Sequence, residues 1–130
     1  MTALRTRTLV PVLGAAALGA VGLRRLLRLE VHGDSMRPGL QPGDRVLVLR
    51  TGRLRVGDLA AVRDPRDPAR VVVKRVAGGS PVTGWRVLGD DPDHSTDSRV
   101  FGAVGADLVV GRVLYRYHPS ERAGFPRPER

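Results

Sequence analysis

The pattern of hydrophobic and polar positions divides the chain into three segments. Residues 9–23 form an uninterrupted uncharged stretch with arginines on both sides, and residues after 30 alternate between short apolar runs and turn-forming residues. The last residues are rich in proline and arginine. We therefore predict an N-terminal hydrophobic helix over 1–28, one folded domain over 29–118 and a disordered tail over 119–130.

Five strands are predicted in the middle segment, because short apolar runs between turn signals are typical of strands. These strands are Arg45 to Arg50, Asp58 to Arg63, Arg70 to Ala77, Trp85 to Leu88, and Asp107 to Tyr117. The breaks between them, such as Pro42-Gly43-Asp44 and Gly78-Gly79, carry turn chemistry. The pattern indicates a compact, mainly β domain, either a barrel or a sheet.

The uncharged stretch 9–23 is short for a membrane span, which needs about 20 apolar residues. Snorkelling arginines and the continuation through Leu26, Leu27 and Leu29 would lengthen it. Three interpretations stay open: a single-pass anchor, a cleaved signal peptide, or an amphipathic helix on the domain or on a membrane. We expect the anchor, with a cytoplasmic location as the alternative, and arginines at both ends leave the orientation undetermined.

Composition narrows the possible partners. The formal net charge of the 130 residues is +9, which favours an anionic membrane surface or nucleic acid. The arginines are scattered and aromatic residues are only 4%, so a base-stacking platform is not expected and neither is nucleic acid. Because the chain has no cysteine, it has no disulfide, no thiolate nucleophile and no cysteine metal ligand. We expect no cofactor and no metal.

Positive charge comes from 21 arginines and a single lysine, Lys74, in the apolar run Val71-Val72-Val73-Lys74-Arg75-Val76. Arginine stays protonated, whereas a buried lysine can lose its proton and act as a base. Strand alternation would place Val72, Lys74 and Val76 on one apolar face. A working base would need its pKa lowered by about 3 units. The alternative is that Lys74 is an ordinary surface lysine.

Two further segments carry candidate chemistry. In Gly33-Asp34-Ser35-Met36-Arg37-Pro38, Ser35 is a candidate nucleophile whose own amide would help to form an oxyanion hole, although Gly-Asp-Ser is also a common turn. In Gly89 to Arg99, Ser95 is placed to orient the lysine amine, and Asp97 and Arg99 to pair and hold the loop. The alternative is a solvated Asp-rich hairpin. A calcium loop fails, because Thr96 stands where glycine is required. The histidines have no informative context.

These segments, in this order, resemble the signature boxes of the signal peptidase I family of Ser-Lys endopeptidases. The likeness covers about residues 31–116 and includes the Gly-Asp openings at Gly43-Asp44 and Gly57-Asp58. It implies a signal-peptidase-like β-barrel or sheet, a precursor protein as substrate and a membrane as partner. It also implies that Ser35 is the nucleophile, Lys74 the base, Ser95 the lysine-orienting residue and Met36 a neighbour of the dyad, with Asp97 and Arg99 structural.

The short separation between the serine and lysine boxes leaves no room for the large inserted domain of bigger signal peptidases. The compact chain, its Gly-Asp-Asp-Pro and Ser-Thr-Asp-Ser-Arg motifs and its Val-Gly-Arg-Val-Leu-Tyr-Arg ending look most like nickel-type superoxide dismutase maturation proteases. Departures from the family pattern are Gly39 in place of threonine and Asp91 in place of asparagine. Gly33 offers no hydroxyl to the oxyanion. A general signal peptidase, or a non-catalytic basic β domain on a membrane or nucleic acid, remain the alternative functions.

Overall fold

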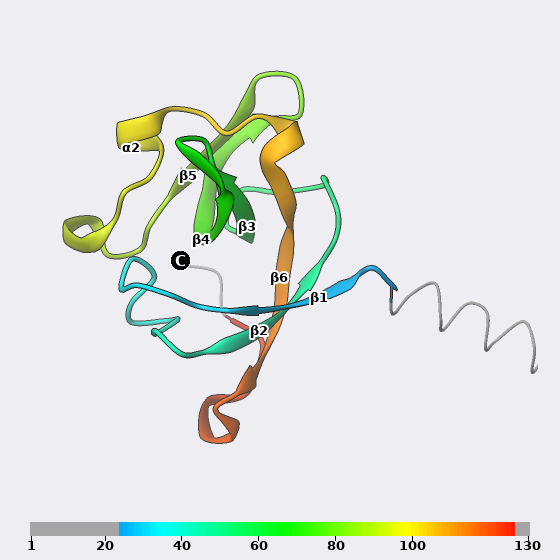
Figure 1. The fold of residues 1–130 in the computed structure, drawn as a ribbon, viewed down its shortest axis with the longest axis vertical. Coiled ribbons are helices and arrows are strands. Elements are labelled where there is room, and N and C mark those ends of the chain that lie inside the picture. Colours follow the sequence, from blue (N-terminus) through cyan, green and yellow to red (C-terminus); the bar gives the residue numbers. More distant parts are fainter. Residues whose placement is uncertain (1–23, 127–130) are drawn as a thin grey trace, which may run out of the picture.

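Six antiparallel strands form one sheet in the computed structural model, which describes residues 24–126 (Figure 1). The strands are β1 (Leu26–Glu30), β2 (Arg45–Leu49), β3 (Leu59–Asp64), β4 (Asp67–Ser80), β5 (Gly84–Leu88) and β6 (Val109–His118). Their order across the sheet is β1-β2-β6-β3-β4-β5. The mainly β class that the sequence predicted is confirmed.

Helical segments within residues 24–126 are short and follow β5. They are η1 (Pro92–His94), α2 (Ser98–Phe101), η2 (Ala106–Leu108) and η3 (Ser120–Arg122). No helix in this range is long and apolar enough to cross a membrane. The hydrophobic helix expected from the sequence falls mainly on residues 1–23, which lie outside the described residues.

The core consists of two hydrophobic clusters that share the central strands. Leu59 and Ala61 of β3 lie in the first cluster, whereas Ala60 and Val62 lie in the second, with Trp85 and Val87 of β5. Successive strand residues point to opposite faces, so both faces of β3 are buried. A strand buried on both faces reads as a continuous apolar run, which explains its sequence.

Strand β1 was not predicted. Residues 26–28 were assigned to the N-terminal helix, but β1 pairs with β2 from Leu26 opposite Leu49 to Glu30 opposite Arg45. The boundary expected at residue 28 therefore lies inside a strand. A leucine-rich run fits a helix or a strand equally well, and here the exposed edge of β2 decides the matter.

At two other places the structure is more regular than the sequence pattern predicted. Gly78 and Gly79 lie within β4 instead of ending it, because a register shift after Val76 accommodates them. The tail, expected to be disordered from residue 119, folds back through residue 126: Arg116 and Gly124 exchange two backbone hydrogen bonds of 2.8 and 3.0 Å. Buried Asp44 accepts hydrogen bonds from the Arg116 and Arg122 guanidinium groups, and this holds the tail.

Candidate active site

Lys74 lies in the middle of β4, opposite Ala60 of β3. Its neighbours on the same face, Val72 and Val76, pack in the second hydrophobic cluster, and Lys74 itself is only 4% exposed. Burial removes water from the ammonium group and lowers the pKa of Lys74 below the ordinary value of 10.5, although the charge of Asp97 opposes this effect. Lys74 is therefore not an ordinary surface lysine.

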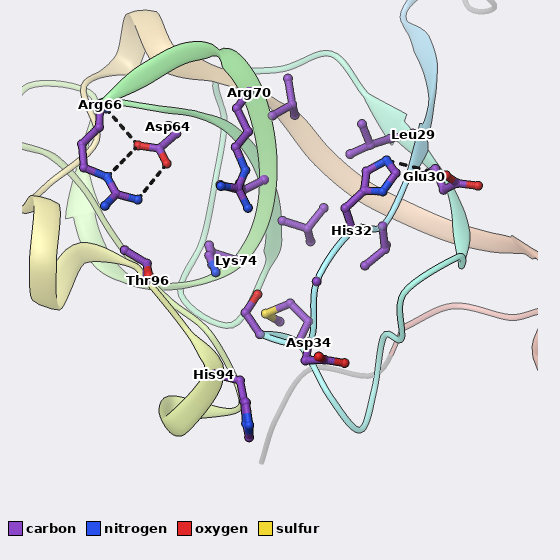
Figure 2. Close-up of a pocket in the computed structure, with 17 residues that line it drawn as sticks. Leu29, Glu30, His32, Asp34, Asp64, Arg66, Arg70, Lys74, His94 and Thr96 are labelled. Atoms are coloured by element: carbon purple, nitrogen blue, oxygen red, sulfur yellow. Dashed lines mark hydrogen bonds and ion pairs between the residues drawn. The ribbon is translucent and has the colours of Figure 1, made fainter.

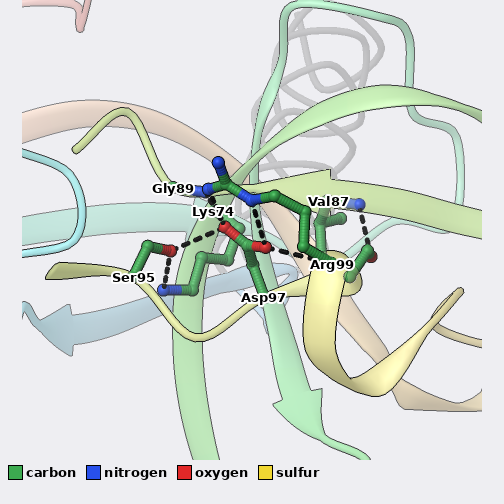
Figure 3. Close-up of polar contacts among 7 residues, drawn as sticks. Lys74, Val87, Gly89, Ser95, Asp97 and Arg99 are labelled. Carbon is green, nitrogen blue, oxygen red and sulfur yellow. Dashed lines mark hydrogen bonds and ion pairs between the residues drawn. The ribbon is translucent and has the colours of Figure 1, made fainter. Parts of the chain in front are cut away.

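A chain of hydrogen bonds links the lysine to the loop after β5 (Figure 3). Lys74 Nζ donates to Ser95 Oγ at 3.2 Å, and the Ser95 hydroxyl donates to Asp97 Oδ2 at 2.7 Å. The Ser95 hydroxyl has one hydrogen, which it donates to Asp97, so toward the Lys74 amine Ser95 can only be a hydrogen-bond acceptor. A neutral Lys74 amine thus keeps its lone pair free for another partner.

Asp97 is fully buried and anchors this loop. It pairs with Arg99 at two points, Nε to Oδ1 at 2.9 Å and Nη2 to Oδ2 at 2.5 Å, and it accepts the Gly89 backbone N–H at 2.8 Å. The hydrogen bonds from Arg99, then those from Gly89 and Ser95, outweigh burial and hold the pKa of Asp97 well below its ordinary value of 3.8. The carboxylate is therefore charged at neutral pH.

Gly89 allows two other segments to approach each other. A Cβ at this position would overlap the Ser95 hydroxyl and would lie 2.9 Å from the carbonyl oxygen of Ser35. The Asp91 backbone N–H donates to that same carbonyl at 2.8 Å. The loop that contacts the lysine therefore also holds the main chain of Ser35, a role for Gly89 that the sequence did not reveal.

Ser35 lies in a turn that begins after β1. Gly33 has a φ of +80°, a conformation that favours glycine, and the turn is closed by hydrogen bonds from Arg37 N to Asp34 O at 3.1 Å and from Leu40 N to Met36 O at 3.0 Å. The Met36 side chain is buried in the first cluster, whereas Ser35 is half-buried. Anchoring Met36 in the core fixes the backbone of its neighbour Ser35.

Ser35 and Lys74 line the same cavity, to which residues 29–36 and 70–74 contribute. Figure 2 shows Lys74 of β4 together with His32 and Asp34 among the residues that line this cavity. Among the described residues the Ser35 side chain makes no hydrogen bond, so the serine and the lysine line one cavity without a hydrogen bond between them. In structures without substrate, catalytic contacts are often long and tighten only when substrate binds.

Two strand edges border this cavity. Strand β1 is at one end of the sheet and pairs with β2 alone. On β4, pairing with β5 begins only at Arg75, so residues 71–74 are paired with β3 on one side and leave their other edge open. Unpaired N–H and C=O groups on such edges can accept an added strand.

Residues outside the predicted set also shape the site. Arg75 makes a two-point ion pair with Asp90, with distances of 2.8 and 2.7 Å, and so holds the residue next to Gly89. His32 and His94 line the cavity but are exposed and contact carboxylates, Glu30 and Asp91 respectively. Neither histidine is bonded to Ser35 in the described part of the chain. Sequence spacing held no signal for the Arg75 pair, which joins β4 to the loop after β5.

Comparison with known proteins assigns the chain to a family. Residues 5–83, a range that includes Ser35 and Lys74, match the family model described as "Signal peptidase, peptidase S26". Mitochondrial ATP-independent inner membrane protease subunit 1a of Arabidopsis thaliana is 37% identical, covering 75% of this chain and 74% of the relative. Mitochondrial inner membrane protease subunit 2 of Schizosaccharomyces pombe is 31% identical, over 72% of this chain and 66% of the relative. Mitochondrial inner membrane protease subunit 1 of Homo sapiens is 28% identical, over 73% of this chain and 71% of the relative. The chain therefore belongs to the signal peptidase, peptidase S26, family of serine peptidases.

Proposed function

We propose that the protein removes an N-terminal leader from a precursor protein, with Ser35 as nucleophile and Lys74 as general base. One observation carries the proposal: a buried lysine with a lowered pKa lines the same cavity as a serine in a rigid turn. A neutral amine can accept a proton, whereas an arginine in its place stays charged. The membership in a serine peptidase family supports this assignment.

The reaction follows from these groups. Ser35 Oγ attacks the scissile carbonyl carbon while the Lys74 amine takes the hydroxyl proton, and the resulting ammonium gives that proton to the departing amine as the C–N bond breaks. The leader stays attached to Ser35 as an ester. Lys74, neutral again, takes a proton from a water molecule that attacks this ester, and the proton returns to Ser35 Oγ when the leader is released.

Backbone donors supply the oxyanion hole in this proposal. Within residues 24–126 the Ser35 backbone N–H has no hydrogen-bond partner, so it is available to the oxyanion. Gly33 carries no hydroxyl that would add a second donor. Ser95 acts as a positioning residue, because its contact with Lys74 Nζ at 3.2 Å fixes the direction of the amine lone pair.

The substrate lies as an extended chain between the open edges of β1 and β4, which would place its scissile bond between Ser35 and Lys74. We further infer that the precursor is a nickel-type superoxide dismutase, which the motif resemblance of this compact chain supports. The relatives named as inner membrane proteases support a location at a membrane, and the uncharged stretch 9–23 supports an N-terminal anchor. A general signal peptidase for secreted precursors is the alternative.

Cleavage of a candidate precursor by the full chain tests the mechanism. Ser35→Ala and Lys74→Arg are expected to reduce the rate by at least about a thousandfold, and Ser120→Ala, an exposed serine far along the chain, is the matched control. Undiminished cleavage by either site variant would refute the dyad. Precursors trapped by Ser35→Ala then separate the substrates: one dismutase precursor supports the narrow role, and many exported proteins support the general one.

A further inference from the structure

Some arginines of the folded domain form ion pairs with carboxylates, whereas others do not. Near the site and the tail, seven arginines form ion pairs with carboxylates: Arg37, Arg45, Arg66, Arg75, Arg99, Arg116 and Arg122. Ten others have no ion pair within residues 24–126, and six of these ten lie at one end of the sheet: Arg24, Arg25, Arg50, Arg53, Arg55 and Arg112. We call these six the basic end.

Strand register brings the basic end together. Leu26 of β1 lies opposite Leu49 of β2, and Leu49 lies opposite Arg112 of β6, so one end of three adjacent strands is aligned. The Arg50 backbone N–H donates to the Arg25 carbonyl at 2.7 Å, which ties the loop after β2 to the start of β1.

Arg53, Arg55 and Arg112 line one hollow together with Thr51. The Asp58 carboxylate is adjacent, but within residues 24–126 it accepts the Arg55 backbone N–H, at 2.8 Å, and no guanidinium group. The guanidinium groups of this hollow therefore keep their charge uncompensated, which favours an anionic partner.

We propose that the basic end docks the folded domain on a membrane surface that contains anionic phospholipid, with lipid phosphates bound by the arginines of the hollow. Two observations favour a membrane over nucleic acid. The uncharged stretch 9–23 ends directly before Arg24, so a membrane-bound segment would deliver this end of the sheet to the surface. The described basic end also contains no aromatic side chain on which a base could stack. Guanidinium groups bind phosphate at two points, which suits lipid headgroups.

The test uses the full chain reconstituted into vesicles, and the absence of cysteine allows single labelling sites. A fluorophore is placed at Gly52→Cys in the basic-end loop, where a Cβ meets nothing within 4 Å, or at Val82→Cys, which is 95% exposed on the β4–β5 turn. Lipids with a nitroxide on the headgroup quench a fluorophore that lies at the surface. We expect quenching of the fluorophore at position 52 but not at position 82. This quenching should occur in vesicles that contain phosphatidylglycerol but not in pure phosphatidylcholine vesicles, and added salt should reduce it.

Charge-matched variants identify the residues responsible. Arg53→Gln with Arg55→Gln should weaken docking at least about tenfold, since one basic residue near an anionic surface contributes about fivefold. Arg63→Gln with Arg86→Gln removes the same net charge from elsewhere and should change docking less than about twofold. Equal quenching at both positions, equal effects of the two pairs, or a response to a DNA duplex instead of to vesicles would overturn the proposal.

Discussion

Replacing Asp97 with asparagine removes one negative charge from the centre of the loop network and keeps the side-chain shape. The carboxylate is fully buried and accepts five hydrogen bonds, from Gly89, from Ser95 and three times from Arg99. Asparagine can still cap α2, but in either orientation its NH₂ group faces donors. The variant therefore isolates the loss of charge and of acceptors.

The expected loss of unfolding free energy is about 3 kcal/mol. Breaking a buried ion pair on one side costs about 3–5 kcal/mol, and the lower end applies because the Arg99 side chain is 39% exposed and can be rehydrated. In a urea titration with a slope of about 2 kcal/mol per molar, this loss moves the midpoint down by about 1.5 M. The slope itself should not change.

The effect also has a definite pH dependence. Because the folded protein lowers the pKa of Asp97 below 3.8, the stabilisation is complete above that value and is lost as the pH falls further, through the folded-state pKa. The gap between wild type and Asp97→Asn should be constant from about pH 5 to 7 and should narrow below about pH 4. Asp93→Asn, an exposed aspartate on the same loop, is the control and should change stability by less than about 0.5 kcal/mol. A loss below about 1 kcal/mol for Asp97→Asn would refute the reasoning.

Three other predictions concern Lys74 and the tail. The kcat/KM for precursor cleavage should rise with pH as Lys74 loses its proton, with a midpoint below 10.5 because burial lowers the pKa of Lys74. A midpoint at or above 10.5 would contradict the assigned base. Between the folded-state pKa of Lys74 and 10.5 only the unfolded chain carries this proton, so the stability of the wild type should rise with pH across that window. The stability of Lys74→Met should show no such rise. At neutral pH this variant should be more stable than the wild type, by about 1.4 kcal/mol for each unit by which folding lowers the pKa. Denaturant titrations at several pH values measure this, and a pH-independent difference would refute it. Arg122→Ala leaves buried Asp44 with Arg116 as its remaining arginine partner, so it should lower the free energy of unfolding by about 1–2 kcal/mol and speed proteolysis after residue 119. Glu121→Ala, at an exposed position, is the control. Unchanged digestion of Arg122→Ala would show that the ion pair does not hold the tail.

The amino-acid pattern was sufficient to identify most strands of the sheet, because β2, β3 and β5 are short apolar runs bounded by glycine, proline or aspartate. It also singled out Lys74, since one lysine among 21 arginines in an apolar run is an unusual choice for a surface charge. Local pattern carries such information because strand periodicity and turn chemistry act over a few residues.

Other features depended on residues that are distant in the sequence. A leucine run became β1 because the edge of β2 was available, and the tail became ordered because Asp44 binds arginines more than seventy residues away. The burial that lowers the pKa of Lys74 depends on segments that are distant in the sequence, among them β3 and the loop that carries Ser95, and Gly89 matters because Ser35 and Ser95 both approach it. Desolvation and close packing arise only when separate segments meet, so the tertiary structure alone decided them.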